Sequence, residues 1–307
     1  MKRINELISY FTKNNETNSH AGPDDKISKA EKTEVTLSRL QEAFNDVHDA
    51  IVQELTCNSN VVSLFYIGSL IEVNKLQSDI IAPLLLEPKQ NLKDTVLSNE
   101  IRPIKTLAQA IESVLQGFVM LFNGSQVMAA NVASTLSRSI ETSEQEHIVY
   151  GPKDSLSEQL EQNLTLIRRR LPSSKLKSRI ITIGSLSKTS IAILYIEGIA
   201  NPDIVDIAIS KTSKIDYDSF FDSSHVSVFL EDHVNSVFPQ LQQTDRPDAI
   251  ASALTSGKVI WIVANTPFAL IRPITFFDLF QSPEDYIHRW MIGTFLRILR
   301  FFAFLTA

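Results

Sequence analysis

The sequence is poor in the residues that build redox and metal sites, because Cys57 is its only cysteine. A single cysteine forms neither an internal disulfide nor a cysteine-based metal site, so we interpret Cys57 as a small buried apolar residue in a reducing compartment. The six histidines show no paired metal spacing. Phosphate-binding glycine loops, the H-E-x-x-H motif and the G-x-S-x-G motif are also missing. Nothing in the residue types argues for an enzyme or a cofactor.

Glycine and proline are scarce, with 9 and 12 residues, which excludes a collagen-like or low-complexity chain. Apolar residues make up 44% and charged residues 21%, which is typical of folded soluble proteins. The 29 basic and 35 acidic residues give a net charge of −6, and this balance does not predict nucleic-acid binding. With 307 residues, the chain is long enough for two domains of about 100–150 residues each.

The N-terminus carries no secretory signal. Met1–Arg3 is basic, but Ile4–Phe11 is interrupted by polar residues and forms no apolar core of a signal peptide. We therefore expect the chain to start in the cytoplasm. Residues 1–33 are polar and irregular, and we predict a flexible tail.

The C-terminal end has the opposite character. The stretch Met291–Ala307 is strongly apolar, with Arg297 and Arg300 as its only charges. It is slightly short for a span of about 20 residues, so we interpret it as an interfacial helix or the first turns of a membrane span. A buried C-terminal helix of a soluble domain is the alternative, and composition does not decide between them. Ser282-Pro283-Glu284-Asp285 has the pattern of a helix start that leads into this segment.

Periodicity predicts an α/β first half. Apolar residues from Val35 to Leu55 recur at helical spacing, and the predicted elements after this helix alternate between strands and helices. They are a strand at Val61–Ile67, a helix at Val73–Leu86 that Pro83 bends or ends, a helix at Ile104–Leu115, and a hairpin of Gly117–Phe122 with Gln126–Val132 around Asn123-Gly124.

The second half repeats this layout. Apolar spacing over Leu156–Leu171 predicts a helix that ends in Arg168-Arg169-Arg170. That run could bind an anion or another subunit, although a solvated helix end is the favoured interpretation. The remaining elements are strands at Ser178–Ile183 and Ser190–Ile196, helices at Pro202–Lys211 (capped by Asn201) and Ala249–Leu254, and a hairpin of Gly257–Val263 with Phe268–Ile271.

Matching landmarks in the two halves indicate an internal duplication. Tyr66-Ile67 corresponds to Tyr195-Ile196, and Gly117 with its hairpin corresponds to Gly257 with its hairpin. We predict two related α/β subdomains with mixed sheets flanked by helices, at 34–140 and 141–280, followed by the helical segment 281–307. A cleft between two such subdomains is a natural place for a ligand or a hinge.

Two further clusters are weak candidates for a site. His225 and His233 lie eight residues apart beside Glu231-Asp232, but a solvated helix end explains them better than a metal site. Asp245-Arg246-Pro247-Asp248 suits a turn that caps the following helix.

Several runs together make the chain resemble the A subunit of the GerA-type spore germination receptors of endospore-forming bacteria. The resemblance covers residue 151 to the C-terminus closely and the first half more loosely, through Phe65-Tyr66-Ile67 and the Asn123-Gly124 hairpin. The closer runs are Gly151-Pro152-Lys153, Asn163–Arg170, Leu194–Pro202, Phe238-Pro239-Gln240, Thr244–Asp248, Thr266-Pro267-Phe268 and Phe280–Tyr286.

The resemblance implies a role and a set of partners. Members act with B and C subunits in the inner membrane of the spore, sense nutrients and trigger ion release. Their N-terminal region is expected on the cytoplasmic, spore-core side, with two substrate-binding-protein-like subdomains, and the A subunits are expected to form a homo-oligomer. It also singles out residues for structure or subunit contact: Arg168, Arg169, Arg170, Tyr195, Glu197, Gly198, Gln240, Arg246, Pro247, Pro267, Pro283, Glu284 and Asp285.

The sequence departs from the family pattern at two loops. Gly68-Ser69 stands where Asp-Gly commonly follows the first Tyr-Ile, and Ala264-Asn265 stands where Asp-Gly commonly precedes Thr-Pro-Phe. The loss of an acid at both places weakens the case for a cation or ligand in these loops. Our leading hypothesis is a non-enzymatic assembly and signal-transduction region attached to a membrane by its C-terminal helix. The alternative is a module that binds a small-molecule germinant in the cleft between the subdomains.

Overall fold

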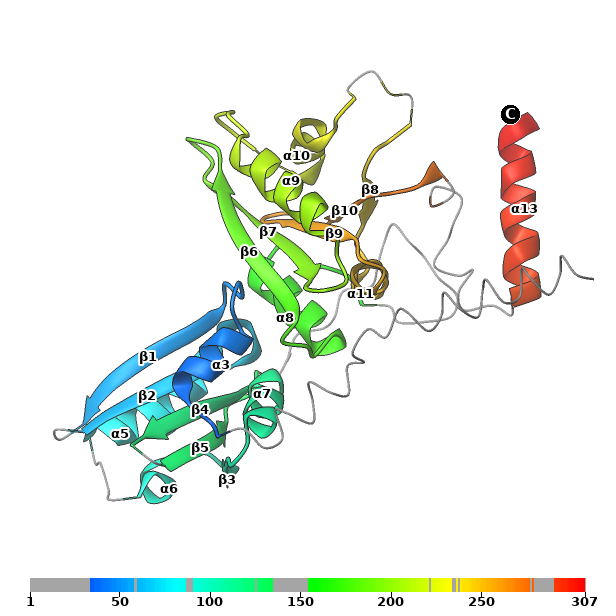
Figure 1. Cartoon of the computed structure of the whole chain (residues 1–307). Helices are drawn as coiled ribbons and strands as arrows, with labels where there is room; N and C mark the ends of the chain where they lie inside the picture. Colours follow the sequence, from blue (N-terminus) through cyan, green and yellow to red (C-terminus); the bar gives the residue numbers. More distant parts are fainter. Residues whose placement is uncertain are drawn as a thin grey trace, which may run out of the picture.

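The computed structural model describes residues 34–57, 60–86, 91–124, 126–134, 154–220, 222–233, 236, 238–276, 278 and 290–306. The predicted tail at 1–33 and the predicted boundary at 140/141 lie outside these residues, as does the helix start at Pro283, Glu284 and Asp285. The first subdomain is drawn in blue to teal and the second in green to orange in Figure 1.

The first subdomain is a five-stranded sheet with helices on both faces. Its elements are α3 (Leu37–Ala43), β1 (Ala50–Cys57), β2 (Asn60–Ile67), η1 (Gly68–Leu70), α4 (Val73–Lys75), the π-helical turn η2 (Leu76–Ile81), α5 (Ala82–Leu86), α6 (Leu92–Thr95), β3 (Ile101–Pro103), α7 (Leu107–Leu115), β4 (Phe118–Asn123) and β5 (Gln126–Asn131). The helix around Pro83 therefore continues to Leu86. The π turn accommodates the proline, with the N–H of Ala82 bonded to the carbonyl of Gln77 five residues back.

The predicted helix over Val35–Leu55 is wrong in its second part. The helix ends at Ala43, and Asp46 adopts a left-handed φ of 57° that turns the chain. Residues 50–57 form β1, which pairs with β2 along all eight residues from Ala50↔Ile67 to Cys57↔Asn60. Pairing with the neighbouring strand β2 and the β-branched Ile51-Val52 thus outweigh the local helical spacing.

The second subdomain has the same succession of elements. They are α8 (Leu160–Arg170), β6 (Leu176–Ile183), β7 (Thr189–Ile196), α9 (Pro202–Ser213), α10 (Ser223–Leu230), β8 (Gln242–Thr244), α11 (Pro247–Thr255), β9 (Val259–Val263) and β10 (Ala269–Arg272), and α13 (Trp290–Thr306) follows. Asn201 caps α9 as predicted, by accepting a hydrogen bond from the N–H of Asp203. The sequence did not indicate α10 or the short edge strands β3 and β8.

The two sheets have one topology. Their strand orders are β1-β2-β4-β5-β3 and β6-β7-β9-β10-β8, so the first, second, fourth, fifth and third strands of each half follow one another. This identity confirms two related α/β subdomains. All pairings within the described sheets are antiparallel, whereas we expected mixed sheets. A tight hairpin such as that of β4 and β5 makes its two strands antiparallel.

Equivalent glycines make the same close contact in both halves. Gly117 and Gly257 precede β4 and β9 with φ of +86° and +81°. An added Cβ would lie 2.8 Å from the carbonyl oxygen of Leu70 and 3.0 Å from that of Ile199, respectively. Each carbonyl belongs to the third residue after the second strand of its half. Glycine is needed at both sites because the backbone is left-handed and the neighbouring chain is close.

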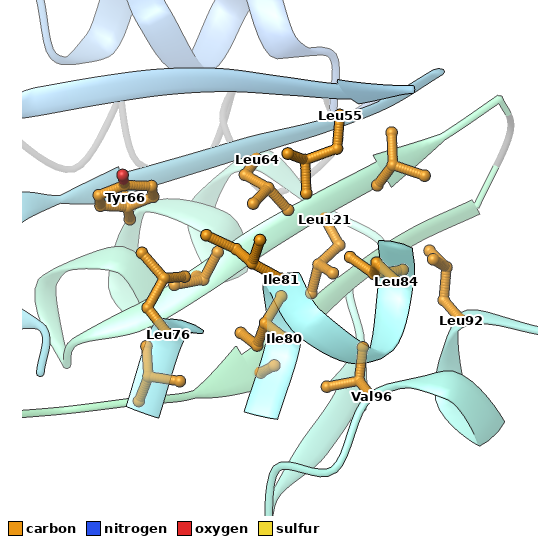
Figure 2. Packing of buried hydrophobic residues seen from close by; sticks show 14 of the residues in the cluster. Leu55, Leu64, Tyr66, Leu76, Ile80, Ile81, Leu84, Leu92, Val96 and Leu121 are labelled. Atoms are coloured by element: carbon orange, nitrogen blue, oxygen red, sulfur yellow. The ribbon is translucent and has the colours of Figure 1, made fainter. Parts of the chain in front are cut away.

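Apolar layers cover both faces of each sheet. In the first subdomain, α3 and α7 pack on one face, and the segment from α4 to α6 packs on the other. Figure 2 shows strand residues Leu55, Leu64, Tyr66 and Leu121 together with Leu76, Ile80, Ile81 and Leu84 from η2 and α5, and with Leu92 and Val96. In the second subdomain, α8 and α11 pack on one face and α9 and α10 on the other.

Candidate functional site: the junction of the two subdomains

The two subdomains meet through a set of residues that we call the junction: 45–49 and 68–70 of the first, and 165–169 and 176–179 of the second. Their backbones pair directly. The N–H of His48 donates to the carbonyl of Ser178 at 3.0 Å, and the N–H of Ser178 donates to the carbonyl of Asp46 at 3.0 Å. A parallel bridge between Val47 and Ser178 results, so the start of β6 is bonded to the chain just before β1.

A buried ion pair lies at the centre of the junction. Arg168 projects from α8 and is 2% exposed, and Asp49 precedes β1 and is 7% exposed. The Nε of Arg168 lies 3.0 Å from Oδ2 of Asp49, and one of its terminal nitrogens lies 2.5 Å from Oδ1. That nitrogen also donates to the hydroxyl of Ser178 at 2.9 Å, and the other donates to the carbonyl of Leu176 at 3.4 Å. This two-point contact is the strongest geometry for an arginine–carboxylate pair.

Hydroxyl groups complete the shell around Asp49. The hydroxyl of Ser69 donates to Oδ2, and that of Thr165, from α8, donates to the carbonyl of Ser69. Burial acts to raise the pKa of Asp49, but the charge and hydrogen bonds of Arg168, with the Ser69 hydroxyl, outweigh it and hold the pKa below its ordinary value. The carboxylate is therefore charged at neutral pH, and its partners come from both subdomains.

Contacts of more unequal exposure surround this centre, from the buried Lys177 to the exposed pair of Arg179 and Asp46. Lys177 donates to the carbonyl of Asn45 at 2.7 Å and lies 3.3 Å from a carboxylate oxygen of Glu197. Arg179 binds Asp46 at 2.9 Å. Burial, followed by the charge of Asp46, raises the pKa of Tyr195. Two of the predicted residues, Tyr195 and Glu197, thus belong to the rim of the junction.

The predicted arginine run divides into three different roles. Arg168 is the buried centre, and Arg169 donates to the carbonyl of Ser134 in the first subdomain. Arg170 binds Asp154 at 2.5 Å within the second half. The favoured interpretation of a solvated helix end is therefore wrong for Arg168. The burial of Arg168 could have been predicted from the sequence, because this residue lies four positions after Leu164 and therefore on the apolar face of its own helix.

The other predicted residues lie away from the junction contacts. Gly198 has a φ of +80° and open space around it. Gln240 binds the backbone of Asp232 and of His233, each at 2.8 Å. Pro267 lies in the turn between β9 and β10.

Arg246 and Pro247 form the start of α11. Pro247 is the first helical residue, and Arg246 is fully buried and binds Asp248 at 2.7 Å. The predicted helix start at this sequence is present, with Arg246 rather than an acid in the capping position.

Sequence reasoning missed the acidic and hydroxyl partners of Arg168. Asp49 lies 119 residues away in the chain, Ser178 enters the sequence reasoning only as the start of a strand, and Ser69, which bonds to Asp49, enters it only as a departure from the family pattern. Among the described residues, no group of three histidine, cysteine, aspartate or glutamate side chains could hold a metal ion.

The C-terminal helix α13 has 17 residues and carries Arg297 and Arg300. In the part of the chain that the structure describes, no helix has the length and apolar character needed to cross a membrane. Met291, Phe295 and Phe302 of α13 are more than half exposed.

Comparison with known proteins gives one consistent result. A sequence model of the Bacillus/Clostridium GerA spore germination protein family matches residues 38–307. The chain is 33% identical over 276 residues to the spore germination protein GerQA of Bacillus cereus, covering 88% of this chain and 55% of that protein. It is 31% identical over 247 residues to the uncharacterized membrane protein YfkQ of Bacillus subtilis, covering 78% and 48%. The chain thus spans about half the length of these relatives.

A solved structure shares the fold. It is the crystal structure of the N-terminal domain of the A subunit of the Bacillus megaterium spore germinant receptor GerK3, with a TM-score of 0.58 and 23% identity. The match covers 78% of this chain and 94% of that domain.

Proposed function

This chain belongs to the GerA family of spore germination proteins, and from that premise we propose that it is the assembly and signal-transduction region of a germinant receptor A subunit. In this proposal it acts in the inner spore membrane with B and C subunits and with further A subunits. The two subdomains lie on the cytoplasmic side, α13 leads to the membrane, and the complex triggers ion release when nutrients bind. The role is non-enzymatic, in keeping with relatives that are named for germination rather than for a reaction.

The buried pair of Arg168 and Asp49 is the observation that carries the proposal. A pair with 2% and 7% exposure, bonded on both sides to hydroxyl and backbone groups, links the two subdomains through short directional contacts. Interfaces of this kind favour discrete arrangements over continuous deformation. A displacement of one subdomain would therefore be passed to the other as a rigid-body movement.

The alternative, a germinant bound between the subdomains, has less support. The polar groups of the junction are bonded to one another: Asp49 to Arg168 and Ser69, and Ser178 to Arg168 and the chain before β1. A ligand would have to replace these contacts, and leaving a buried charge unpaired is costly.

Spores of the host organism test the proposal. A strain lacking the gene is complemented with the natural gene, with Arg168→Met or with Arg179→Met, and nutrient-triggered germination is followed by the loss of optical density. We expect the Arg168→Met spores to respond much more slowly, and the Arg179→Met spores, changed at an exposed contact of the same junction, to respond nearly normally. Receptor levels are compared by immunoblotting. If spores of the strain that lacks the gene germinate normally with every nutrient tested, the receptor role is refuted.

Calorimetric titration separates the two functions. The full chain, in mild detergent, is titrated with amino acids, sugars and nucleosides. A ligand present at 100 times its Kd would stabilise the chain by about 2.7 kcal/mol. Absence of both heat and thermal stabilisation is expected for an assembly region, whereas saturable binding that Arg168→Met abolishes would favour the alternative.

A further inference from the structure

An exposed aromatic pair marks a second surface on the second subdomain. The rings of Phe238 and Phe276 lie edge to face, with centroids 5.3 Å apart and an interplanar angle of 88°. The two side chains come from the chain before β8 and the chain after β10, and they are 46% and 40% exposed. Large aromatic side chains held this far in solvent are more typical of an interaction surface than of a monomer surface.

A pocket of about 310 Å³ lies beside these rings. Its lining includes these two rings together with Gln240, Arg272 and Pro273. Its one charged lining residue, Arg272, donates to the carbonyl of Leu230 at 2.6 Å and pairs with Asp232. Gln240 bonds to the backbone of Asp232 and so supports the loop that carries this acid. With the charge of Arg272 directed toward Asp232, the pocket offers uncharged surface, in which the rings and prolines contribute about as much as the polar groups.

The C-terminal helix supplies a third ring. Phe304 of α13 lies 6.3 Å from Phe276, ring centroid to ring centroid, with an interplanar angle of 70°. Phe238, Phe276 and Phe304 therefore form a series of edge-to-face contacts that we call the aromatic ladder. The contact joins two apolar groups that both remain partly exposed, since Phe304 is 48% exposed. Such a pair contributes beyond the area that it buries.

From these contacts we propose that the aromatic ladder, with the adjoining pocket, is the docking surface on which the second subdomain receives α13 of the same chain. Phe276 is the central residue, because it contacts both other rings and lies four residues after the end of β10. The occupant is this helix rather than another apolar segment, because its Phe304 already makes the contact. The proposal deepens the coupling role given above, since it identifies where the membrane-directed helix meets the subdomains.

Cysteine cross-linking of the full chain in mild detergent tests the docking itself. The natural Cys57 is buried and serves as a silent background. The variant carries Thr275→Cys, next to Phe276, and Ala303→Cys, next to Phe304, and is treated with a short bis-maleimide. We expect efficient cross-linking within one chain. A control pair, Leu186→Cys with Ala303→Cys, places the first cysteine at an exposed position in the β6–β7 turn and is expected to react poorly.

Removal of the central ring supplies the second readout. Adding Phe276→Leu to the reactive pair keeps an apolar side chain but removes the edge-to-face contacts, and should lower the yield about two- to tenfold. Tyr217→Leu, which removes an exposed ring from another aromatic cluster, should leave the yield unchanged. Equal yields for the two cysteine pairs, cross-links between chains, or indifference to Phe276→Leu would each overturn the proposal. These results do not depend on germination, so a failed receptor assay leaves the docking test valid.

Discussion

Replacing Arg168 with methionine removes the cation that is bonded to the buried carboxylate of Asp49. In Arg168→Met, the carboxyl group of Asp49 keeps its burial and the Ser69 hydroxyl but loses two charge-assisted hydrogen bonds. Breaking a buried pair by removing one partner costs about 3–5 kcal/mol. A typical domain has a free energy of unfolding of about 5–15 kcal/mol, so the loss is a large part of the total.

Urea unfolding of the full chain, followed by circular dichroism, measures this loss. Arg179→Met is the matched control, because Arg179 also crosses the junction but the side chains of its pair with Asp46 are 43% and 40% exposed. Exposed pairs contribute up to about 1 kcal/mol. A loss in Arg168→Met no larger than that of the control would refute the reasoning that the buried pair fastens the two subdomains.

The pH dependence of the two proteins gives an independent check. In the natural chain the pKa of Asp49 is held below its ordinary value of 3.8, so its contribution to stability is present above that pH and is lost as the pH falls through the lower folded value. In Arg168→Met burial dominates, and the pKa rises. A group with a raised pKa stabilises the fold below its unfolded pKa and loses this contribution as the pH increases. The stability difference between the two proteins should therefore narrow from neutral pH toward about pH 3. A constant or widening difference would contradict this cause.

Three further experiments test local features of the fold. Gly117→Ala should destabilise more than Gly198→Ala, because both have a positive φ but only the first would place a Cβ 2.8 Å from the carbonyl oxygen of Leu70; comparison of the two Tm values checks this. Asn163→Ala should lower the free energy of unfolding by about 1–3 kcal/mol in urea titration, because the fully buried amide bonds to both backbone groups of one residue. Cys57 should react slowly with iodoacetamide in the native chain and quickly in urea, since burial raises the pKa of its thiol; rapid native labelling would argue against a closed first core.

Patterns that involve neighbouring residues predicted much of the fold. The strands at 61–67 and 190–196, the hairpins and the capped helix at Pro202 are local in origin, because periodicity and turn residues decide them. Strand β1 shows the limit of this approach. Its residues continue a helical spacing, and only pairing with β2, which the local pattern does not contain, makes them a strand. The sequence did not predict the short edge strands β3 and β8 for the same reason, because only pairing with β5 and β10 makes these residues strands.

The junction was predictable only in part. Arg168 belongs to a conspicuous basic run, and its position on an apolar helix face predicts that its side chain is buried. A buried arginine needs an acidic partner. Nothing in the sequence identified Asp49 as that partner, because the two residues are 119 positions apart and belong to different subdomains. The family resemblance selected Tyr195 and Glu197 as well, but it did not place them beside Asp46 and Lys177.

The duplicated topology has a geometric consequence for the joint in the middle of the molecule. The joint connects unlike surfaces, since the chain before the first strand of one repeat meets the start of the first strand of the other. Each repeat has a counterpart of both surfaces, so the joint in the middle of the molecule uses one of the two copies of each surface. The start of β1 is the counterpart of the start of β6, and its Ile51 and Val52 are still 39% and 36% exposed. Heterologous interfaces of this type can repeat, and they then form closed rings or open filaments. A two-fold interface is occupied as soon as two copies have paired.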